Sequence, residues 1–303
     1  MATQTGFVGL GVMGTPMALN LARAGTPLAV WSRSPDQYDA LREAGARTVE
    51  HIDDLFDDCR TIILMLANDN AIDTVLGRHT PAFEARVRGH VIVNMGTNSA
   101  AYSLELAQEI AAAGGRYVEA PVSGSRKPAE AGQLVVMLAG EPDDVDAVRA
   151  LVQPLCRDSF TCGAVPAALT MKLAVNLFLI TMVTGLTEAT HFAQRHGIDL
   201  ALFANVLNAS PMASDVSRVK IDKLAMQDFS VQAAITDVLK NARLVAEAAR
   251  GAGVASPLLD LCHALYGETE ALGLGKQDMV AVVRAIEART SAIEQTDHPA
   301  AQG

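Results

Sequence analysis

Residues 6–25 read G-F-V-G-L-G-V-M-G-T-P-M-A-L-N-L-A-R-A-G, and this stretch decides the fold. A short apolar run meets glycines in G-x-G-x-x-G spacing, at Gly9, Gly11 and Gly14, and a helical pattern follows at once. This spacing gives a tight turn, a close approach to a pyrophosphate, and close packing of helix on strand. The free N–H groups at the helix N-terminus suit phosphates. The stretch therefore predicts a dinucleotide-binding turn, in which Met13 is also a candidate cofactor-binding residue.

The alternation of strands and helices continues to about residue 164. Apolar runs typical of strands occupy 27–32, 61–66, 91–95, 116–120 and 134–139, with helical patterns between them. Such alternation predicts a doubly wound parallel sheet. Later patterns are helical only, over 167–195, 200–208, 215–225, 231–251, 256–272 and 276–291. We expect an α/β protein with a Rossmann domain over 1–164 and an all-α domain over 165–303, joined by a long helix.

The overall composition restricts the partners. Lys and Arg less Asp and Glu give 24 − 34 = −10, which argues against nucleic-acid binding and anionic membrane surfaces. The stretch 173–186 is predicted to be too short and too polar for a bilayer span. The cysteines are scattered, and the single pair Glu188-x-x-His191 has no second copy, so no metal site is predicted. Free thiols and no signal-peptide pattern favour the cytoplasm. The apolar helices of the second half favour a homodimer or homotetramer.

The end of the second predicted strand indicates which dinucleotide binds. NAD enzymes usually place an acid there, about 20 residues past the glycines. Here the chain reads Ser32-Arg33-Ser34, and the first acid is Asp36. A guanidinium between two hydroxyls suits a 2′-phosphate, because Arg binds phosphate with two parallel hydrogen bonds. The alternative is an Arg solvated in a surface loop. We predict NADP (NADPH) as the cofactor.

Motifs in the same order along nearly the whole chain resemble those of the β-hydroxyacid dehydrogenases, the 3-hydroxyisobutyrate dehydrogenase-like family. G-L-G-V-M-G-T-P-M-A-L-N-L (9–21) resembles their opening motif, and E-A-P-V-S-G-S (119–125) their substrate loop. K-L-A-V-N (172–176) resembles their catalytic K-x-x-x-N helix, and 229–239 their C-terminal segment. The longer run 119–134 is most similar to the glyoxylate/succinic semialdehyde reductase branch.

The resemblance implies reversible hydride transfer between NAD(P) and a small acid that bears a hydroxyl or an aldehyde. It implies that Lys172 is the acid/base group. It also implies that Ser123 and Gly124 bind the substrate carboxylate and that Asn176 helps to orient the substrate.

Other matched positions are Thr97, implied to lie near the nicotinamide, and Phe229 and Asp237, implied to close the pocket. One departure is Thr236, which stands where the family usually has Lys, while Lys240 lies one turn later. This departure leaves the exact substrate open.

The residues can also be judged on their own chemistry. Carbonyl reduction needs a proton donor at the oxygen, where negative charge develops. Lys172 lies near the start of an apolar helix, where burial lowers a lysine pKa, and Asn176 falls on the same face one turn later. Taken alone, the pair could equally be a snorkelling Lys and a structural Asn. The loop Ser123-Gly124-Ser125 could direct N–H groups at a carboxylate or form an ordinary turn.

We expect an NADPH-dependent reductase of a small aldehyde acid, such as glyoxylate or succinic semialdehyde. The first alternative is an imine or larger-carbonyl reductase on the same fold, although such relatives generally lack the helix lysine. The second is a non-enzymatic, cofactor-bound scaffold. Val175 stands where phosphogluconate dehydrogenases carry His, which argues against a sugar-phosphate substrate.

Overall fold

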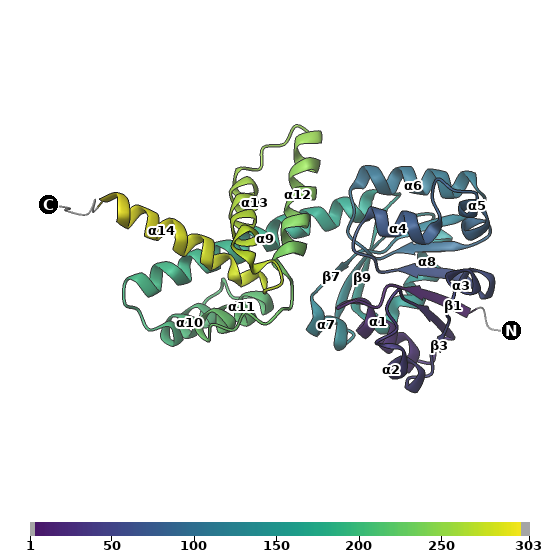
Figure 1. The fold of residues 1–303 in the computed structure, drawn as a ribbon, viewed down its shortest axis with the longest axis horizontal. Helices are drawn as coiled ribbons and strands as arrows, with labels where there is room; N and C mark the ends of the chain where they lie inside the picture. Colours follow the sequence, from purple (N-terminus) through teal and green to yellow (C-terminus); the bar gives the residue numbers. More distant parts are fainter. Residues whose placement is uncertain (1–3, 298–303) are drawn as a thin grey trace. The chain divides into compact units, whose positions relative to one another are not determined.

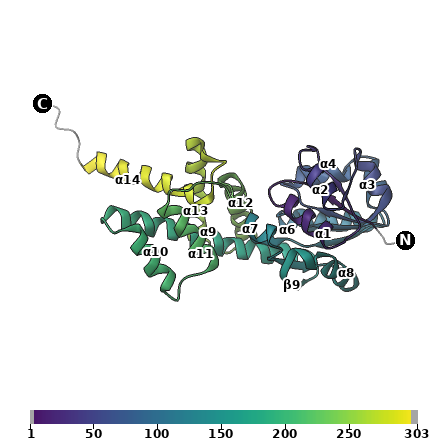
Figure 2. The same cartoon turned by 90° about the horizontal axis from the view of Figure 1, so that it is seen from below.

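The computed structural model describes residues 4–297. The polar, Pro-containing tail over 296–303, which its composition predicts to be frayed, lies for the most part outside the described residues. The chain divides into two compact units after Leu173 (Figures 1 and 2). This division lies inside helix α9 (Ala167–Arg195), later than the boundary at residue 164 that the strand patterns indicated. The first turns of α9 therefore belong with the sheet.

The first unit contains one mixed sheet. Its strands are β1 (Gln4–Val8), β2 (Leu28–Trp31), β3 (Arg47–Thr48), β4 (Cys59–Leu64), β5 (Val91–Asn94), β6 (Arg116–Glu119), β7 (Val122–Ser123), β8 (Leu134–Ala139) and β9 (Cys156–Gly163). They lie in the order β3-β2-β1-β4-β5-β6-β8-β7, and β9 pairs with β8. Strands β1 to β6 are parallel, which confirms the Rossmann expectation. The strand order reverses between β1 and β4, and ligands bind at such a switch point, beyond the carboxyl ends of the strands.

The far edge of the sheet departs from the predicted all-parallel arrangement. Strand β8 runs antiparallel to β6 and β7, and β9 runs parallel to β8. Strand β9 was not predicted, because its sequence C-R-D-S-F-T-C-G is polar and mostly solvent-exposed. An edge strand lacks the continuous apolar run that marks a buried parallel strand.

Helices cover both faces of the sheet. They are α1 (Gly14–Arg23), α2 (Tyr38–Glu43), α3 (Ile52–Asp58), α4 (Asp69–Leu76), α5 (Ala82–Val87), α6 (Ala100–Ala112), α7 (Arg126–Glu130) and α8 (Pro142–Val152). Alternate strand residues enter different cores: Phe7 packs with α1, α2 and α8, while Val8 packs with α3, α4 and α6. This alternation follows from the two-residue period of a strand and confirms a doubly wound sheet.

The second unit is helical. It continues along α9 and adds α10 (Leu200–Ala209), α11 (Asp215–Ala225), α12 (Ile235–Gly251), α13 (Pro257–Thr269) and α14 (Val283–Asp297). Within it, α10 packs on α11, α12 on α13, and α13 on α14. Helices α9 and α11 have the predicted bounds, but α12 begins later than residue 231. The amides of Ile235 and Met279 donate to Gln277 and Ala233 carbonyls, and the segment before α12 is not helical, with Ala234 extended.

Helix α9 is long and apolar enough to cross a membrane by length and composition, with a mean hydropathy of 1.7 over an 18-residue window. The argument that its apolar stretch is too short to span a bilayer is therefore wrong. Core helices of soluble proteins have the same properties, and Ile180, Val183 and Thr187 form a buried stripe at helical spacing. Burial of this stripe accounts for part of the apolar composition of α9. The absence of a membrane partner stays a prediction.

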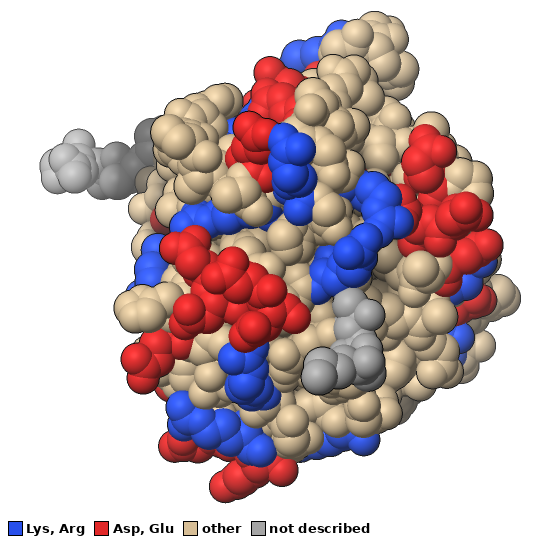
Figure 3. Space-filling model, turned by 90° about the vertical axis from the view of Figure 1, so that its right-hand side faces the viewer, with Lys and Arg blue, Asp and Glu red and all other residues tan. Residues whose placement is uncertain are grey.

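The charged side chains do not segregate on the face shown in Figure 3. Lys and Arg side chains are interspersed with Asp and Glu side chains there, and no large basic patch lies on this face. The chain as a whole has a net charge of −10. On this face, only local groups could hold an anionic cofactor.

Candidate active site

The turn between β1 and α1 requires glycine at two points. Gly9 has φ +101°, and a Cβ there would lie 2.3 Å from the Met65 carbonyl oxygen. A Cβ at Gly14 would lie 1.8 Å from the Gly9 carbonyl oxygen, so α1 packs directly on the end of β1. At Gly11 a Cβ would meet no atom of residues 4–297 within 4 Å, which leaves open space beside the backbone. Half-buried Met13 immediately precedes α1. This cradle at the switch point fits the pyrophosphate of a dinucleotide.

The end of β2 lies beside this turn. The Gly9 amide donates to the Trp31 carbonyl oxygen at 3.3 Å, which joins the two strand ends. The Ser32 amide donates to the Tyr38 hydroxyl at 2.9 Å, and this bond fixes the backbone where the strand stops. Arg33 and Ser34 follow and are exposed. The guanidinium is therefore available at the edge where the adenosine ribose of a dinucleotide would lie.

The loop after β5 is anchored from two sides. The Asn94 side-chain oxygen accepts a hydrogen bond of 3.0 Å from the Gly96 amide. A Cβ at Gly96 would lie 2.8 Å from the Leu66 carbonyl oxygen, so this loop packs closely on the end of β4. Half-buried Thr97 follows at the same edge of the sheet as Gly9, because the carboxyl ends of parallel strands lie together. Its place near the nicotinamide stays a prediction.

The predicted substrate loop continues from the end of β6. Ser123 pairs with Val135 of β8 and is half-buried, and Gly124 is exposed. Gly124 has φ +132°, and a Cβ there would lie 2.7 Å from the Leu134 Cδ2 atom. Glycine is therefore required for the turn itself. Carboxylate binding by these two residues stays a prediction.

Lys172 lies in the first turns of α9 and is only 8% exposed. Burial penalises its ammonium form and lowers its pKa from the usual 10.5 to about 8. A lysine with a pKa of about 8 can release and regain a proton near neutral pH, whereas a lysine with the usual pKa of 10.5 stays protonated there. Its position and acidity suit a general acid.

Asn176 lies one turn after Lys172 on α9 and is 3% exposed. Its side-chain nitrogen is buried and finds no hydrogen-bond acceptor within residues 4–297. An unsatisfied buried amide costs about 1–3 kcal/mol, so such groups often mark functional positions. A polar substrate atom could supply the acceptor.

Two more predicted residues, Phe229 and Asp237, lie in the segment before α12 and in its first turn. Phe229 is half-buried, with the Arg284 guanidinium 4.8 Å from its ring centre, and Asp237 is exposed. Thr236 donates to a Glu270 carboxylate oxygen at 2.8 Å. Thr236 therefore ties α12 to the π turn over Glu270–Leu274. The closing role of Phe229 and Asp237 stays a prediction.

A buried ion pair between Lys220 and Asp278 was not predicted from the sequence. Asp278 is 0% exposed and lies 2.8 Å from the Lys220 ammonium. It also accepts from the Gln232 and Ala233 amides, at 2.9 and 3.2 Å. Burial lowers the Lys220 pKa, although Asp278 opposes that shift. Local sequence patterns offer no signal that would have paired two residues so far apart in the chain.

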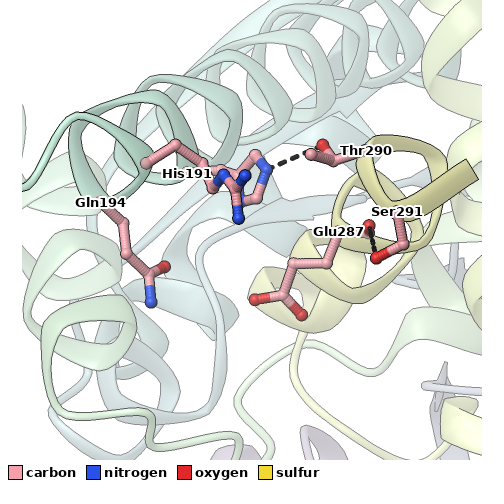
Figure 4. A pocket seen from close by; sticks show the side chains of 6 residues that line it. His191, Gln194, Glu287, Thr290 and Ser291 are labelled. Atoms are coloured by element: carbon pink, nitrogen blue, oxygen red, sulfur yellow. Dashed lines mark hydrogen bonds between the residues drawn. The ribbon is translucent and has the colours of Figure 1, made fainter. Parts of the chain in front are cut away.

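A pocket in the second unit lies between the end of α9 and α14 (Figure 4). It is lined by His191, Gln194, Arg195, Glu287, Thr290 and Ser291. The His191 Nε2 and Thr290 Oγ1 atoms are 2.9 Å apart and join the two helices. The predicted site residues are not among its lining, so the pocket is separate from the candidate active site.

Family comparisons span both units. A family model described as the NAD binding domain of 6-phosphogluconate dehydrogenase matches residues 4–163. Another, described as NAD-binding of NADP-dependent 3-hydroxyisobutyrate dehydrogenase, matches residues 167–286.

Two of the relatives below align over nearly the full length of this chain, and a third aligns over about two thirds of it. Glyoxylate/succinic semialdehyde reductase 1 of Arabidopsis thaliana is 29% identical over 284 residues, 94% of this chain and 98% of that protein. Escherichia coli (strain K12) 2-hydroxy-3-oxopropionate reductase is 29% identical over 282 residues, 93% of this chain and 96% of that protein. Human mitochondrial 3-hydroxyisobutyrate dehydrogenase is 34% identical over 209 residues, 69% of this chain and 62% of that protein.

Solved structures share the fold. The 3-hydroxyisobutyrate dehydrogenase of Salmonella typhimurium superposes with a TM-score of 0.84 at 23% identity, covering 93% of this chain and 99% of that chain. Psf3 in complex with NADP+ and 2-OPP gives the same TM-score of 0.84 at 23% identity, with the same coverage of 93% and 99%. Both units of the chain thus follow a known architecture.

Proposed function

The chain belongs to the β-hydroxyacid dehydrogenase family, and on that premise we propose that it is an NADPH-dependent reductase of a small aldehyde acid. As a member of this family it is an oxidoreductase that acts on CH–OH groups with a nicotinamide cofactor. The finer proposal concerns the cofactor form, the substrate class and the proton donor.

The cofactor proposal rests on the edge of the first unit. The Gly9–Gly14 cradle would hold the pyrophosphate, and Arg33 with the two flanking serines would hold a 2′-phosphate. No acidic residue precedes Asp36 at the end of β2, where an NAD enzyme usually has one. The chemistry that a reduced nicotinamide supplies when bound is a hydride for the carbonyl carbon.

Lys172 carries the mechanistic proposal. As hydride reaches the carbonyl carbon, the oxygen gains negative charge, and the Lys172 ammonium transfers its proton to that oxygen. The product is the hydroxy acid, and the neutral amine regains a proton from water. The observation that supports this role is the burial of Lys172, which brings its pKa to about 8.

Other groups of this chain would orient the substrate. The amide nitrogen of Asn176, which has no acceptor within residues 4–297, would donate to a substrate oxygen, and the loop at Ser123 and Gly124 would bind the carboxylate. The Arabidopsis and E. coli relatives are named for glyoxylate, succinic semialdehyde and 2-hydroxy-3-oxopropionate, which are small acids with an aldehyde group. A small aldehyde acid has one carbonyl oxygen, which would take the Lys172 proton, and one carboxylate, which the loop at Ser123 and Gly124 would bind.

The test is a panel of carbonyl substrates followed by NADPH and NADH oxidation. Glyoxylate, succinic semialdehyde, tartronate semialdehyde and cyclic imines are compared by kcat/KM. We expect at least one aldehyde acid to exceed every imine, with NADPH preferred. Faster turnover of imines, or no turnover of any aldehyde acid, would refute the proposal.

A further inference from the structure

A buried chain of hydrogen bonds starts at the end of β5. The Asn94 side-chain nitrogen donates to the Tyr117 hydroxyl at 3.0 Å. The Tyr117 and Ser103 hydroxyls are 2.9 Å apart, and Ser103 donates to the Glu119 Oε1 atom at 2.5 Å. All four side chains are buried. These hydrogen bonds thus run from the last residue of β5, just before the loop that carries Thr97, to a carboxylate at the end of β6.

The other carboxylate oxygen of Glu119 reaches helix α9. Its Oε2 atom accepts the amide N–H of Ala168 at 3.0 Å and of Leu169 at 3.1 Å. The first N–H groups of a helix have no partner within the helix, and the positive end of the helix dipole favours an anion there. Lys172 follows Ala168 by one turn. The same carboxylate therefore fixes the end of the helix that carries Lys172.

This arrangement is costly for a simple cap. Glu119 is 0% exposed, and burial raises its pKa, because an ionised carboxylate loses its hydration there. A Ser, Thr, Asp or Asn just before the helix would cap it locally. The residues before α9 are Ala164, Val165 and Pro166 instead, and the acceptor comes from 49 residues earlier.

We propose that Glu119 is a positioning residue for Lys172: its carboxylate joins the end of β6, the loop after β5 and the first turn of α9, and so sets where the lysine ammonium lies. The proposal rests on the proposed role of Lys172. Glu119 begins the substrate loop, so one side chain places the proton donor relative to both the substrate loop and the loop at Thr97. A merely structural cap would contribute to stability alone.

A double-mutant cycle separates the two roles. In the wild-type background, Glu119→Ala is expected to lower kcat about 10–100-fold with NADPH affinity unchanged within about twofold. In the Lys172→Ala background, Glu119→Ala is expected to change the residual kcat less than about twofold, because a group that acts through Lys172 has nothing left to position. Equal effects in both backgrounds, or an unchanged kcat in the single variant, would overturn the proposal.

Two further variants keep the cycle informative. Glu119→Gln retains an oxygen for both amides of α9 and is expected to restore most of the kcat lost in Glu119→Ala. If Glu119→Ala does not fold, Ser103→Ala replaces it in the cycle, because it removes the donor to Oε1 and leaves both bonds to α9. For Ser103→Ala a decrease of about 3–10-fold is expected in the wild-type background alone.

Asp199→Ala is the matched control. The Asp199 carboxylate caps α10 by accepting the Leu202 amide at 2.7 Å. Its loss removes a helix cap elsewhere, so Tm is expected to fall while kcat stays unchanged. A comparable fall in kcat for Asp199→Ala would mean that capping in general, and not the link to Lys172, controls turnover.

A readout without turnover uses the ¹⁵N resonance of the Lys172 Nζ atom, assigned by comparison with Lys172→Ala. In Glu119→Ala the pKa of Lys172 is expected to rise from about 8 toward 10.5 as the amine leaves its buried position. Loss of a negative charge alone would lower that pKa, so an unchanged or lowered value counts against positioning.

The cycle also separates this inference from the proposed function. It is run with the best carbonyl substrate of the wild-type protein, so failure of the aldehyde acids refutes the substrate class and leaves the cycle intact. Normal turnover by Lys172→Ala alone refutes the role of the lysine and is visible before Glu119 is changed.

Discussion

The Gly9 carbonyl oxygen lies 1.8 Å from the point that a Cβ at position 14 would occupy. Helix α1 therefore packs on the end of β1 at a distance that only a hydrogen at Gly14 allows. Because the clash would be with backbone, a side chain cannot be accommodated by a rotamer change. The close packing brings the helix N-terminus to the edge where phosphates bind.

Gly14→Ala is expected to lower the free energy of unfolding by about 1–3 kcal/mol, because α1 must shift away from β1. It is also expected to weaken NADPH binding. Gly11→Ala is the matched control, since a Cβ there meets nothing within 4 Å. That variant should keep its stability and still lose NADPH affinity. Chemical denaturation and NADPH titration check both, and a fully stable Gly14→Ala variant would contradict the packing argument.

Lys172→Ala is expected to lower kcat about 10²–10⁴-fold, because the proton donor is lost, while NADPH binding is retained. Lys172→Met fills the same space without the ammonium and should lose as much. Steady-state kinetics and cofactor titration measure both effects. If the methionine variant keeps near-normal turnover, the lysine serves packing and not catalysis.

The pKa of Lys172, about 8, predicts opposite pH dependences for the two directions. Reduction needs the ammonium, so its kcat/KM should be level below about pH 8 and fall above it. Oxidation needs the neutral amine, so its kcat/KM should rise up to about pH 8 and then level off. These profiles report groups of the free enzyme. An inflection near 10.5, the ordinary lysine value, would contradict the assignment.

Arg33→Ala is expected to reduce the preference for NADPH over NADH at least about tenfold, because an Arg–phosphate pair is a charge-assisted contact of about 1.5–3 kcal/mol. Arg42→Ala is the control, since Arg42 is an exposed residue of α2 that pairs with Asp39. The ratio of kcat/KM for the two cofactors checks both variants. An unchanged ratio in Arg33→Ala would reject the 2′-phosphate contact.

Asp278→Ala is expected to destabilise the protein by about 3–5 kcal/mol, because the buried Lys220 ammonium loses its counter-charge. Glu268→Ala breaks the exposed pair with Arg289 and should cost at most about 1 kcal/mol. Urea denaturation of both variants measures the difference. If both variants lose the same free energy of unfolding, burial does not make the Lys220–Asp278 pair more important for stability than an exposed pair.

Much of the fold follows from patterns that act within a few residues. Helix α11 begins after Ser214, which forms a capping box with Ser217, and its bounds match those predicted. Helix α12 shows where this fails: its pattern extends back to residue 231, but the segment before Ile235 makes tertiary hydrogen bonds with residues 277 and 279 and is not helical. Strand β9 was missed because an edge strand lacks the apolar run on which prediction depends.

The candidate site shows the same division. The glycine turn, Arg33 and Lys172 could be named from the sequence, because each lies in a short motif with a known chemical use. The amino-acid sequence by itself determined which residues are proposed to carry this chemistry and most of the helices and strands that hold them. Only the tertiary structure decided that Glu119 would meet the amides of Ala168 and Leu169, and that Asp278 would meet Lys220. Such contacts join residues far apart in the chain, so they follow from how the elements pack and not from any local period or cap.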